Sequence, residues 1–563
     1  MSLQEREQRP TSPFDQGLRR LADLDRHLGD PDDPANPVGW AALLEADEAG
    51  EVPFAGERAL DAFGLAAELT PVDHGGRYDR LDVLSLMLRQ VFRRDASLGV
   101  SLGLMTFMAA VHVWSFGSEK QQLRIADLLL GGGRMTNAYH EVAHSNDLLR
   151  AEYTARPTPG GFLIDGQKQV IFNGSRADVL TVFCRTGAGP GQFGHSVLLV
   201  DRASLPADRI RELPRHEMLG LRSCHVAGLA FDACPVDGSA LVGEAGSGAE
   251  LALRSFQPAR TVAASAAIGV ADTALRICTR QAGRANGAAA AVLAGAFTDL
   301  LLCDALALAA TRAAHLLPEE TGLYSALVKY LVPRLLQETL QDLSSVLGRA
   351  VYERHGATGF FQKCQRDLPV VGLGHAGTAA CQATALPQLL RLAAGPGFRG
   401  EEAPAELFRP GGDLPPLPSR ASSLVALRDP IGSSLTGRGA EPELAGRAQL
   451  LVDELDTLSG QFRELAPAEQ QALGDPKAFA LTDRYALLLA ASAVLNVWRN
   501  SGPADAFLSD PAWAVTALDR LCGRLGLPSP DLPPVYRERL LRELHDRCDQ
   551  RRGLDLYALP TVR

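Results

Sequence analysis

Short β-rich segments lie between two long helical stretches of this chain, and that order restricts the folds open to it. The segments lie between Met135 and about Pro235 and are separated by turns such as Asp165–Gly166. They are Gly161–Asp165, Val170–Phe172, Val179–Cys184 and Ser196–Val200. Before and after them, apolar residues recur at helical spacing. The pattern predicts a β domain inserted between helical domains.

Long helices and a Pro- and Gly-rich stretch divide the rest of the chain. After Gly248, Ala- and Leu-rich patterns predict helices at Glu250–Gly283, Gly287–Leu317, Ser325–Arg354 and Gly377–Leu392. We expect a flexible N-terminus (1–19), an N-terminal helical domain (20–134), a central β domain (135–240), a helical bundle (241–395), a linker or long wrapping segment (396–440) and an extra helical domain (441–563). The predicted fold class is therefore α+β, mostly α.

Charge and cysteine content exclude several classes of function. The net charge is -10 in 563 residues, which argues against binding to a nucleic-acid backbone. The nine cysteines form no CxxC pair, which favours reduced thiols in a cytoplasmic protein over disulfides or a zinc site. The start of the chain has no apolar signal-peptide core, and no uncharged apolar run reaches the length of a membrane span.

Six motifs occur in a fixed order between about residues 85 and 395. They are Phe116–Gln121, Ala138–Glu141 with Asn146–Asp147, Asp165–Lys168 with Ile171–Ser175, Leu219–Ser223, the helix from Arg260 to Gly269, and Arg366–Asp367 with Gly374–Thr378. In their order and spacing the chain resembles the acyl-CoA dehydrogenase family. The resemblance implies an N-terminal helical domain, a central β-barrel domain and a C-terminal four-helix bundle. Residues 440–563 fall outside it, although larger relatives carry a comparable extra helical domain.

The resemblance also implies FAD as cofactor and an acyl thioester, on coenzyme A or on an acyl carrier protein, as substrate. By position in the motifs, the candidate residues at the flavin are Tyr139, His140, Glu141, Asn146, Phe172, Asn173, Arg284 and Thr378. The candidates at the substrate are Arg260 and Gly377. Core packing is the alternative role for Tyr139 and Phe172, and a solvated helix end is the alternative for Arg284. We expect no metal site, because no cluster has ligand spacing.

The catalytic base is the main departure from the family pattern. The family places a glutamate immediately before the Gly-Thr pair, where this chain has Ala376. Some relatives carry the base just before the helix arginine, where this chain has Ala259. His375 is a substitute of suitable pKa, with helix entry or packing as its alternative role.

Three functions remain open from the sequence. The first is an FAD-dependent oxidoreductase acting on an acyl thioester in specialised biosynthesis. The second is a flavin-dependent monooxygenase on the same fold, which needs no base at the α-carbon. The third is a homologue that binds a thioester or partner protein without redox chemistry. Because Gly287–Leu317 is too apolar for a solvent face, neighbouring helices or a second subunit must cover it, and we expect a homodimer or homotetramer.

Overall fold

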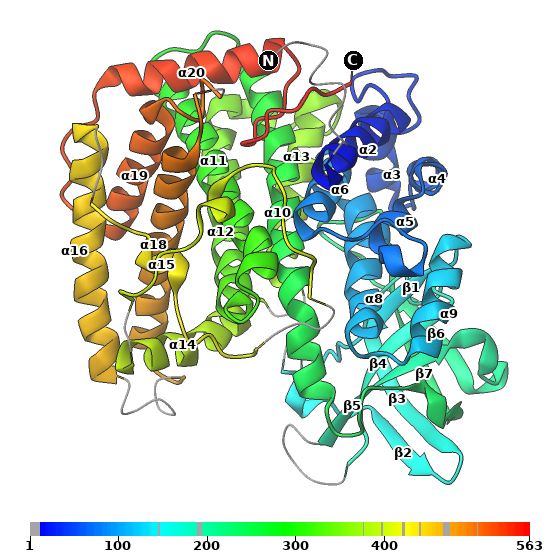
Figure 1. Ribbon diagram of the computed structural model, residues 1–563. Helices are drawn as coiled ribbons and strands as arrows, with labels where there is room; N and C mark the ends of the chain where they lie inside the picture. Colours follow the sequence, from blue (N-terminus) through cyan, green and yellow to red (C-terminus); the bar gives the residue numbers. More distant parts are fainter. Residues whose placement is uncertain are drawn as a thin grey trace.

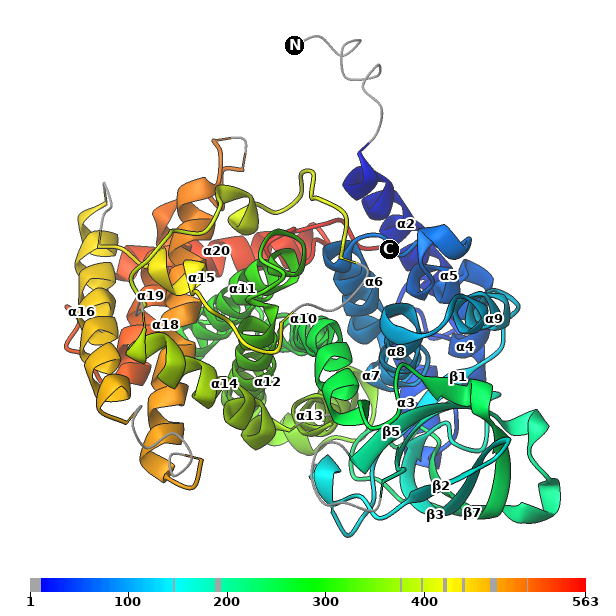
Figure 2. The same ribbon diagram turned by 60° about the horizontal axis from the view of Figure 1, so that its bottom comes forward.

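The computed structural model of the protein describes residues 12–144, 147–187, 194–374, 377–395, 398–418, 423–437, 441–465, 473–503 and 505–562. It confirms the mostly helical α+β class with a central sheet. Helices of the C-terminal region, the central bundle and the N-terminal region lie side by side, with the strands below the last of these (Figure 1). Seen after a 60° turn, the strands come forward beside α8 and α10 (Figure 2).

From residue 12 on, the structure describes eight helices in the N-terminal region, of which α6 and α8 are almost wholly buried. They are α2 (Pro13–Leu28), α3 (Trp40–Ala49), α4 (Phe54–Phe63), α5 (Leu65–Leu69), α6 (Leu81–Arg94), α7 (Ala96–Leu98), α8 (Met105–Phe116) and α9 (Glu119–Leu130), with a π-helical stretch at Gly99–Leu104 before α8. Ser118 caps α9 in a reciprocal capping box with Gln121. The prediction that residues 1–19 are flexible is wrong from Pro13 on, because Ser12 caps α2 and Phe14 is buried.

The β domain is one sheet with the strand order β6-β7-β3-β2-β4-β5-β8, and β1 pairs in parallel with β4. The strands are β1 (Met135–Ala138), β2 (Thr154–Thr158), β3 (Gly161–Phe172), β4 (Val179–Arg185), β5 (His195–Asp201), β6 (Ile210–Arg215), β7 (Val226–Asp237) and β8 (Leu241–Val242). The two strands predicted on either side of Asp165–Gly166 are one strand, β3. Where a turn was expected, the pairing of β3 with β7 shifts in register, and Gly166 has φ +117 there.

Five helices, α10 to α14, follow the sheet and form the central bundle. They are α10 (Gly248–Ala282), α11 (Gly287–Leu316), α12 (Thr321–Leu347), α13 (Gly356–Leu373) and α14 (Thr378–Ala394). The sequence analysis did not predict α13, which contains Pro369 but keeps apolar residues at Phe360, Cys364 and Leu368 facing the core.

The segment predicted as a linker packs against the helices over the ranges that the structure describes. The His315 ring lies 2.8 Å from the carbonyl oxygen of Pro415, and Gln257 donates to the carbonyl of Ser423 at 3.1 Å. Asp429 is buried between Tyr324 and Tyr485, both of which donate hydroxyl hydrogen bonds to it. The segment therefore wraps the bundle and does not hang free between domains.

Five more helices are described in the rest of the chain, starting with the short α15 in the wrapping segment, and they cover α11 and α12. They are α15 (Pro430–Ser433), α16 (Pro442–Leu465), α18 (Pro476–Asn500), α19 (Pro511–Leu525) and α20 (Pro534–Asp549). From Leu293 to His315 the residues of α11 are buried, and they pack against α12, α18, α19 and α20 of the same chain. Neighbouring helices therefore cover α11, so this helix lends no support to a second subunit, and the homodimer or homotetramer stays a prediction.

Contrary to the expectation from the sequence, four helical stretches are long and apolar enough to cross a membrane by length and composition alone. They are Ala96–Phe116, Gly248–Ala282, Gly287–Leu316 and Pro476–Asn500. Between 72% and 100% of their most apolar windows is buried inside the fold, so packing against other helices accounts for their composition.

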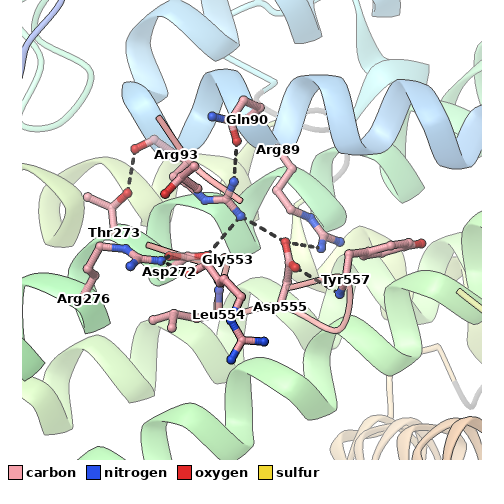
Figure 3. Close-up of polar contacts among 12 residues, drawn as sticks. Arg89, Gln90, Arg93, Asp272, Thr273, Arg276, Gly553, Leu554, Asp555 and Tyr557 are labelled. Carbon is pink, nitrogen blue, oxygen red and sulfur yellow. Dashed lines mark hydrogen bonds and ion pairs between the residues drawn. The ribbon is translucent and has the colours of Figure 1, made fainter. Parts of the chain in front are cut away.

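The C-terminal tail after α20 returns to the centre of the molecule and ends beside α2 (Figure 1). Asp555 of this tail lies between Arg89 and Arg93 of α6, at 3.2 and 3.0 Å, and Asp272 of α10 contacts Arg93 at 3.0 Å (Figure 3). Burial alone would raise the pKa of Asp555, but the two guanidinium groups outweigh it and hold that pKa below its usual value. The tail is therefore fastened by buried ion pairs.

We expect Asp555→Ala to lower the free energy of unfolding by roughly 3–5 kcal/mol, because it removes a buried carboxylate from two buried arginines. Urea denaturation measures the loss. The control is Asp456→Ala, which removes an exposed ion pair with Arg399 and should cost no more than about 1 kcal/mol. Equal stability of the two variants would show that the tail is not fastened in this way.

Candidate functional site at the junction of the β domain and the bundle

Strand β1 presents alternate residues to two different cores. Ala138 belongs to the core inside the sheet, whereas Met135 and Tyr139 belong to the core shared with the helices. Because side chains alternate along a strand, Asn137 faces the helices too. Asn137 is buried, and neither atom of its side-chain amide has a hydrogen-bond partner among the described residues. A buried amide without partners is costly, so this position suits a ligand with a polar edge.

Tyr139 lies in an aromatic cluster at the same junction. Its ring centroid is 5.2 Å from that of Phe183 and 5.6 Å from that of Phe256 on α10. Its hydroxyl lies 2.5 Å from Nε2 of His112, and Nδ1 of His112 lies 2.7 Å from the carbonyl oxygen of Met108. Because a carbonyl only accepts, Nδ1 carries the proton and Nε2 accepts from Tyr139. The structure thus places Tyr139 in core packing, and its contact with flavin stays a prediction.

His112 makes the stability of this junction depend on pH. Burial lowers the pKa of His112 to about 4, from 6.5. The unfolded chain therefore takes up this proton first as the pH falls, and stability present above pH 6.5 is lost towards pH 4. The shift corresponds to about 3 kcal/mol. We expect His112→Gln, which keeps an acceptor for Tyr139, to lose less stability than the wild type over this range in urea denaturation. Identical pH slopes would contradict this role of His112.

A buried ion pair holds the chain after β1. The Glu141 carboxylate lies 2.6 Å from Nζ of Lys168 and accepts backbone N–H groups of Glu152 and Tyr153 at 2.7 and 3.2 Å. Burial alone would raise the pKa of Glu141, but Lys168 and the two N–H donors leave it below its usual value. The Glu141 carboxylate is therefore engaged by groups of the protein itself and positions the loop. A contact with flavin is expected from the neighbouring residues instead.

His140 and the end of β3 lie beside each other. His140 forms an isolated antiparallel bridge with Val170 of β3. At the end of this strand Phe172 is half-buried, and Asn173 has a left-handed conformation with φ +56. The Asn173 side chain donates to the carbonyl of Ser101 at 3.1 Å, so it ties the β domain to the helical region. The predicted flavin residues His140, Phe172 and Asn173 are thus brought together at the C-terminal end of β3.

The turn at Leu219–Ser223 is fixed to α13 by buried charge. Asp367 accepts the backbone N–H of Leu221 at 2.6 Å, and Lys363 lies 2.6 Å from Asp367 and 2.7 Å from Asp95. A Cβ on Gly220 would meet the carbonyl oxygen of Arg366 at 2.0 Å, so only glycine allows this approach. The contact brings the Leu219–Ser223 motif and the Arg366–Asp367 motif, which are distant in sequence, together in space.

On the helical side, Arg260 of α10 lines a cavity of about 340 Å³ between α10 and α14. Arg260 is only 3% exposed, and its Nε has no hydrogen-bond partner among the described residues. Its guanidinium lies 5.9 Å from the ring centroid of Phe256, which links it to the aromatic cluster around Tyr139. The β side and the helical side of the site therefore meet at Phe256 and Arg260.

Lys329 of α12 supports the turn that the sequence analysis singled out. Its buried ammonium donates to the carbonyl groups of Val371 and Gly374, the latter at 3.2 Å, at the C-terminal end of α13. Burial, with a smaller contribution from Arg260, lowers the pKa of Lys329 to about 8. Gly377, which is buried, starts α14 with no side-chain cap, and Thr378 is the first helical residue. Sequence analysis missed Lys329, although a lone lysine in an apolar helix was the available signal.

One predicted residue is not brought to this junction, and two others are not described. His375 and Asn146 lie outside the described residues. Arg284 is exposed beyond the end of α10, and Ala282, the last residue of that helix, lies about 33 Å along it from Arg260 at 1.5 Å per residue. In the described ranges, no group of three His, Cys, Asp or Glu residues is arranged to hold a metal ion.

Comparison with known proteins identifies the class that this fold and junction define. No family model matches the chain. An acyl-CoA dehydrogenase of Bacillus subtilis is 28% identical over 238 residues, which are 42% of this chain and 61% of that protein. The chain therefore spans less than two thirds of the length of the curated relatives it matches.

Solved structures extend the likeness in fold to nearly the whole chain. An acyl-CoA dehydrogenase of Bacillus anthracis complexed with FAD has a TM-score of 0.70 at 16% identity, over 94% of this chain and 95% of that one. A prolyl acyl carrier protein oxidase has a TM-score of 0.58 at 15% identity, over 66% of this chain and 97% of that one. The chain is a divergent homologue of the acyl-CoA dehydrogenases.

Proposed function

We propose that the protein is an FAD-dependent oxidoreductase that acts on an acyl thioester, carried by coenzyme A or an acyl carrier protein, in a specialised biosynthetic pathway of the cytoplasm. The observation that carries the proposal is the junction itself, where the unpaired polar groups of Asn137 and Arg260 are buried on either side of the aromatic cluster. The named activities of the relatives, a dehydrogenase and a carrier-protein oxidase, support this substrate class.

The residues at the junction fit a flavin. Asn137 offers a buried amide without a partner, and the left-handed turn at Asn173 lets the backbone pass close to a ring. Thr378 opens a helix of 17 residues with no side-chain cap, so its first N–H groups can donate to an acceptor. We propose that His140, Phe172, Asn173 and Thr378 hold the cofactor, with Asn137 at its polar edge. FAD, when bound, supplies the acceptor for a hydride from the substrate.

The acid–base groups of the site favour the flavin-dependent monooxygenase as the alternative function. The described residues that line the cavity beside Arg260 include no Asp, Glu or His. Lys329 is held by two carbonyl groups, and His112 is occupied on both ring nitrogens. For the dehydrogenase function we therefore propose His375 as the base that replaces the missing glutamate. A flavin-dependent monooxygenase, which needs no such base, is the second candidate function.

The absorption spectrum of the purified protein separates these functions. The proposal predicts a yellow protein, or one that takes up FAD. It also predicts that Asn137→Leu weakens FAD binding, while Asn500→Leu, at the half-buried C-terminal end of α18, does not. Reduction by NAD(P)H and not by acyl thioesters would favour the monooxygenase. Failure to bind FAD would leave only a non-redox homologue.

A further inference from the structure

The cavity between α10 and α14 is positively charged. Its walls are one face of each helix, with Arg260 on α10 and Arg391 on α14. The remaining lining is apolar or neutral, with Leu424 and Val425 closing one side. None of the described residues that line the cavity is acidic, so the described lining offers Arg260 no carboxylate.

Arg260 is the unusual member of this pair. It is buried, and within the described part of the chain neither a hydrogen bond nor an ion pair satisfies its guanidinium. The buried ammonium of Lys329 lies near enough to repel it, and Phe256 supplies only a ring face. A charge taken out of water in this way is costly unless an anion completes it.

We propose that the anion is a carboxylate on the acyl group of the substrate, so the enzyme takes acyl thioesters that carry a second acid group. This inference rests on the proposed function and narrows its substrate class. A guanidinium binds a carboxylate through two parallel N–H···O bonds, and Arg260 has its donors available for this. A cavity of about 340 Å³ accommodates a short acyl chain with such a group.

The phosphate of the pantetheine arm is the other anion that the substrate brings. Pantetheine thioesters lack that phosphate, so they isolate the acyl group. The probes are succinyl-pantetheine and butyryl-pantetheine. Their acyl chains are of equal length and end in a carboxylate and in a methyl group, respectively. Their dissociation constants are measured by calorimetry on the full chain.

We expect the wild type to bind succinyl-pantetheine roughly 10- to 100-fold more tightly than butyryl-pantetheine, as for a hydrogen bond between charged groups. Arg260→Gln should abolish this preference, whereas Arg280→Gln, on the same helix but paired with Asp32 at the surface, should keep it. Thermal unfolding of the free protein gives a second readout, in which Arg260→Gln should be at least as stable as the wild type.

The outcomes separate this inference from the function on which it rests. Equal binding of the two probes, or a preference that survives Arg260→Gln, overturns the carboxylate and leaves the thioester function standing. A second outcome is that the wild type binds neither pantetheine probe but binds succinyl-CoA and butyryl-CoA equally well. This outcome assigns the arginines to the phosphate and also overturns the carboxylate. Binding of none of the four thioesters overturns the proposed function as well. A marked loss of stability in Arg260→Gln would show that the arginine is structural.

Discussion

Deleting residues 441–563 is expected to leave no soluble protein. The deletion uncovers α11, whose apolar residues from Leu293 on pack against α18, α19 and α20. It also removes Arg520, which lies 2.6 Å from the buried Asp299 of α11, and leaves that carboxylate without its guanidinium. Large apolar surfaces without cover promote aggregation, and an unpaired buried charge adds to the cost.

The fraction of truncated chain in the supernatant after expression measures this effect. Co-expression of residues 441–563 as a separate chain is the matched control, and it should return residues 1–440 to the soluble fraction. A truncated chain that is soluble by itself and retains FAD would show that the C-terminal helices are not part of the structural core.

Replacing His375 or Ala376 is expected to change proton exchange at the α-carbon of the substrate by the largest factor of any point change. If His375 is the base, His375→Ala slows exchange by roughly 10²–10⁴-fold, the contribution of a positioned general base. Of the described residues that flank positions 375 and 376, Gly374 accepts a hydrogen bond from Lys329 and Gly377 is buried. We expect Ala376→Glu to restore or raise exchange, because it returns a carboxylate to the position that the family pattern assigns to the base.

Deuterium wash-in at the α-carbon, followed by mass spectrometry, measures this exchange. His355→Ala is the matched control, since His355 lies at the opposite end of α13 and should leave the rate unchanged. Absence of exchange in the wild type together with undiminished product formation would rule out a base-dependent dehydrogenation and favour the monooxygenase.

Hydropathy patterns predicted the order of domains but not the continuity of single elements. The sheet between two helical regions followed from the change of apolar spacing near Met135. Gly166 suggested a turn, yet β3 runs through it because its pairing with β7 absorbs the irregularity as a register shift. Pro369 similarly concealed α13, although Phe360, Cys364 and Leu368 recur at helical spacing. In both cases tertiary packing outweighs the local preference of one residue.

The site was predicted by motif, and motifs do not reveal which polar groups are already satisfied. Glu141 and Tyr139 were predicted at the flavin, but Lys168 and His112 engage their polar atoms. Conversely, the sequence carries no signal for Asn137. Only the burial of its side-chain amide without hydrogen-bond partners among the described residues distinguishes it. The partners in each case come from distant elements, which no local pattern encodes.

The central claim is that this fold oxidises an acyl thioester with bound FAD. The most direct test mixes the FAD-loaded protein with succinyl-CoA, and separately with butyryl-CoA, in the absence of oxygen, and follows the visible flavin absorbance and the product. We predict that the flavin is bleached by at least one thioester and that an α,β-unsaturated thioester forms in equal amount. An FAD-loaded protein that keeps its full flavin absorbance with both thioesters, and yields no unsaturated product, would contradict the claim.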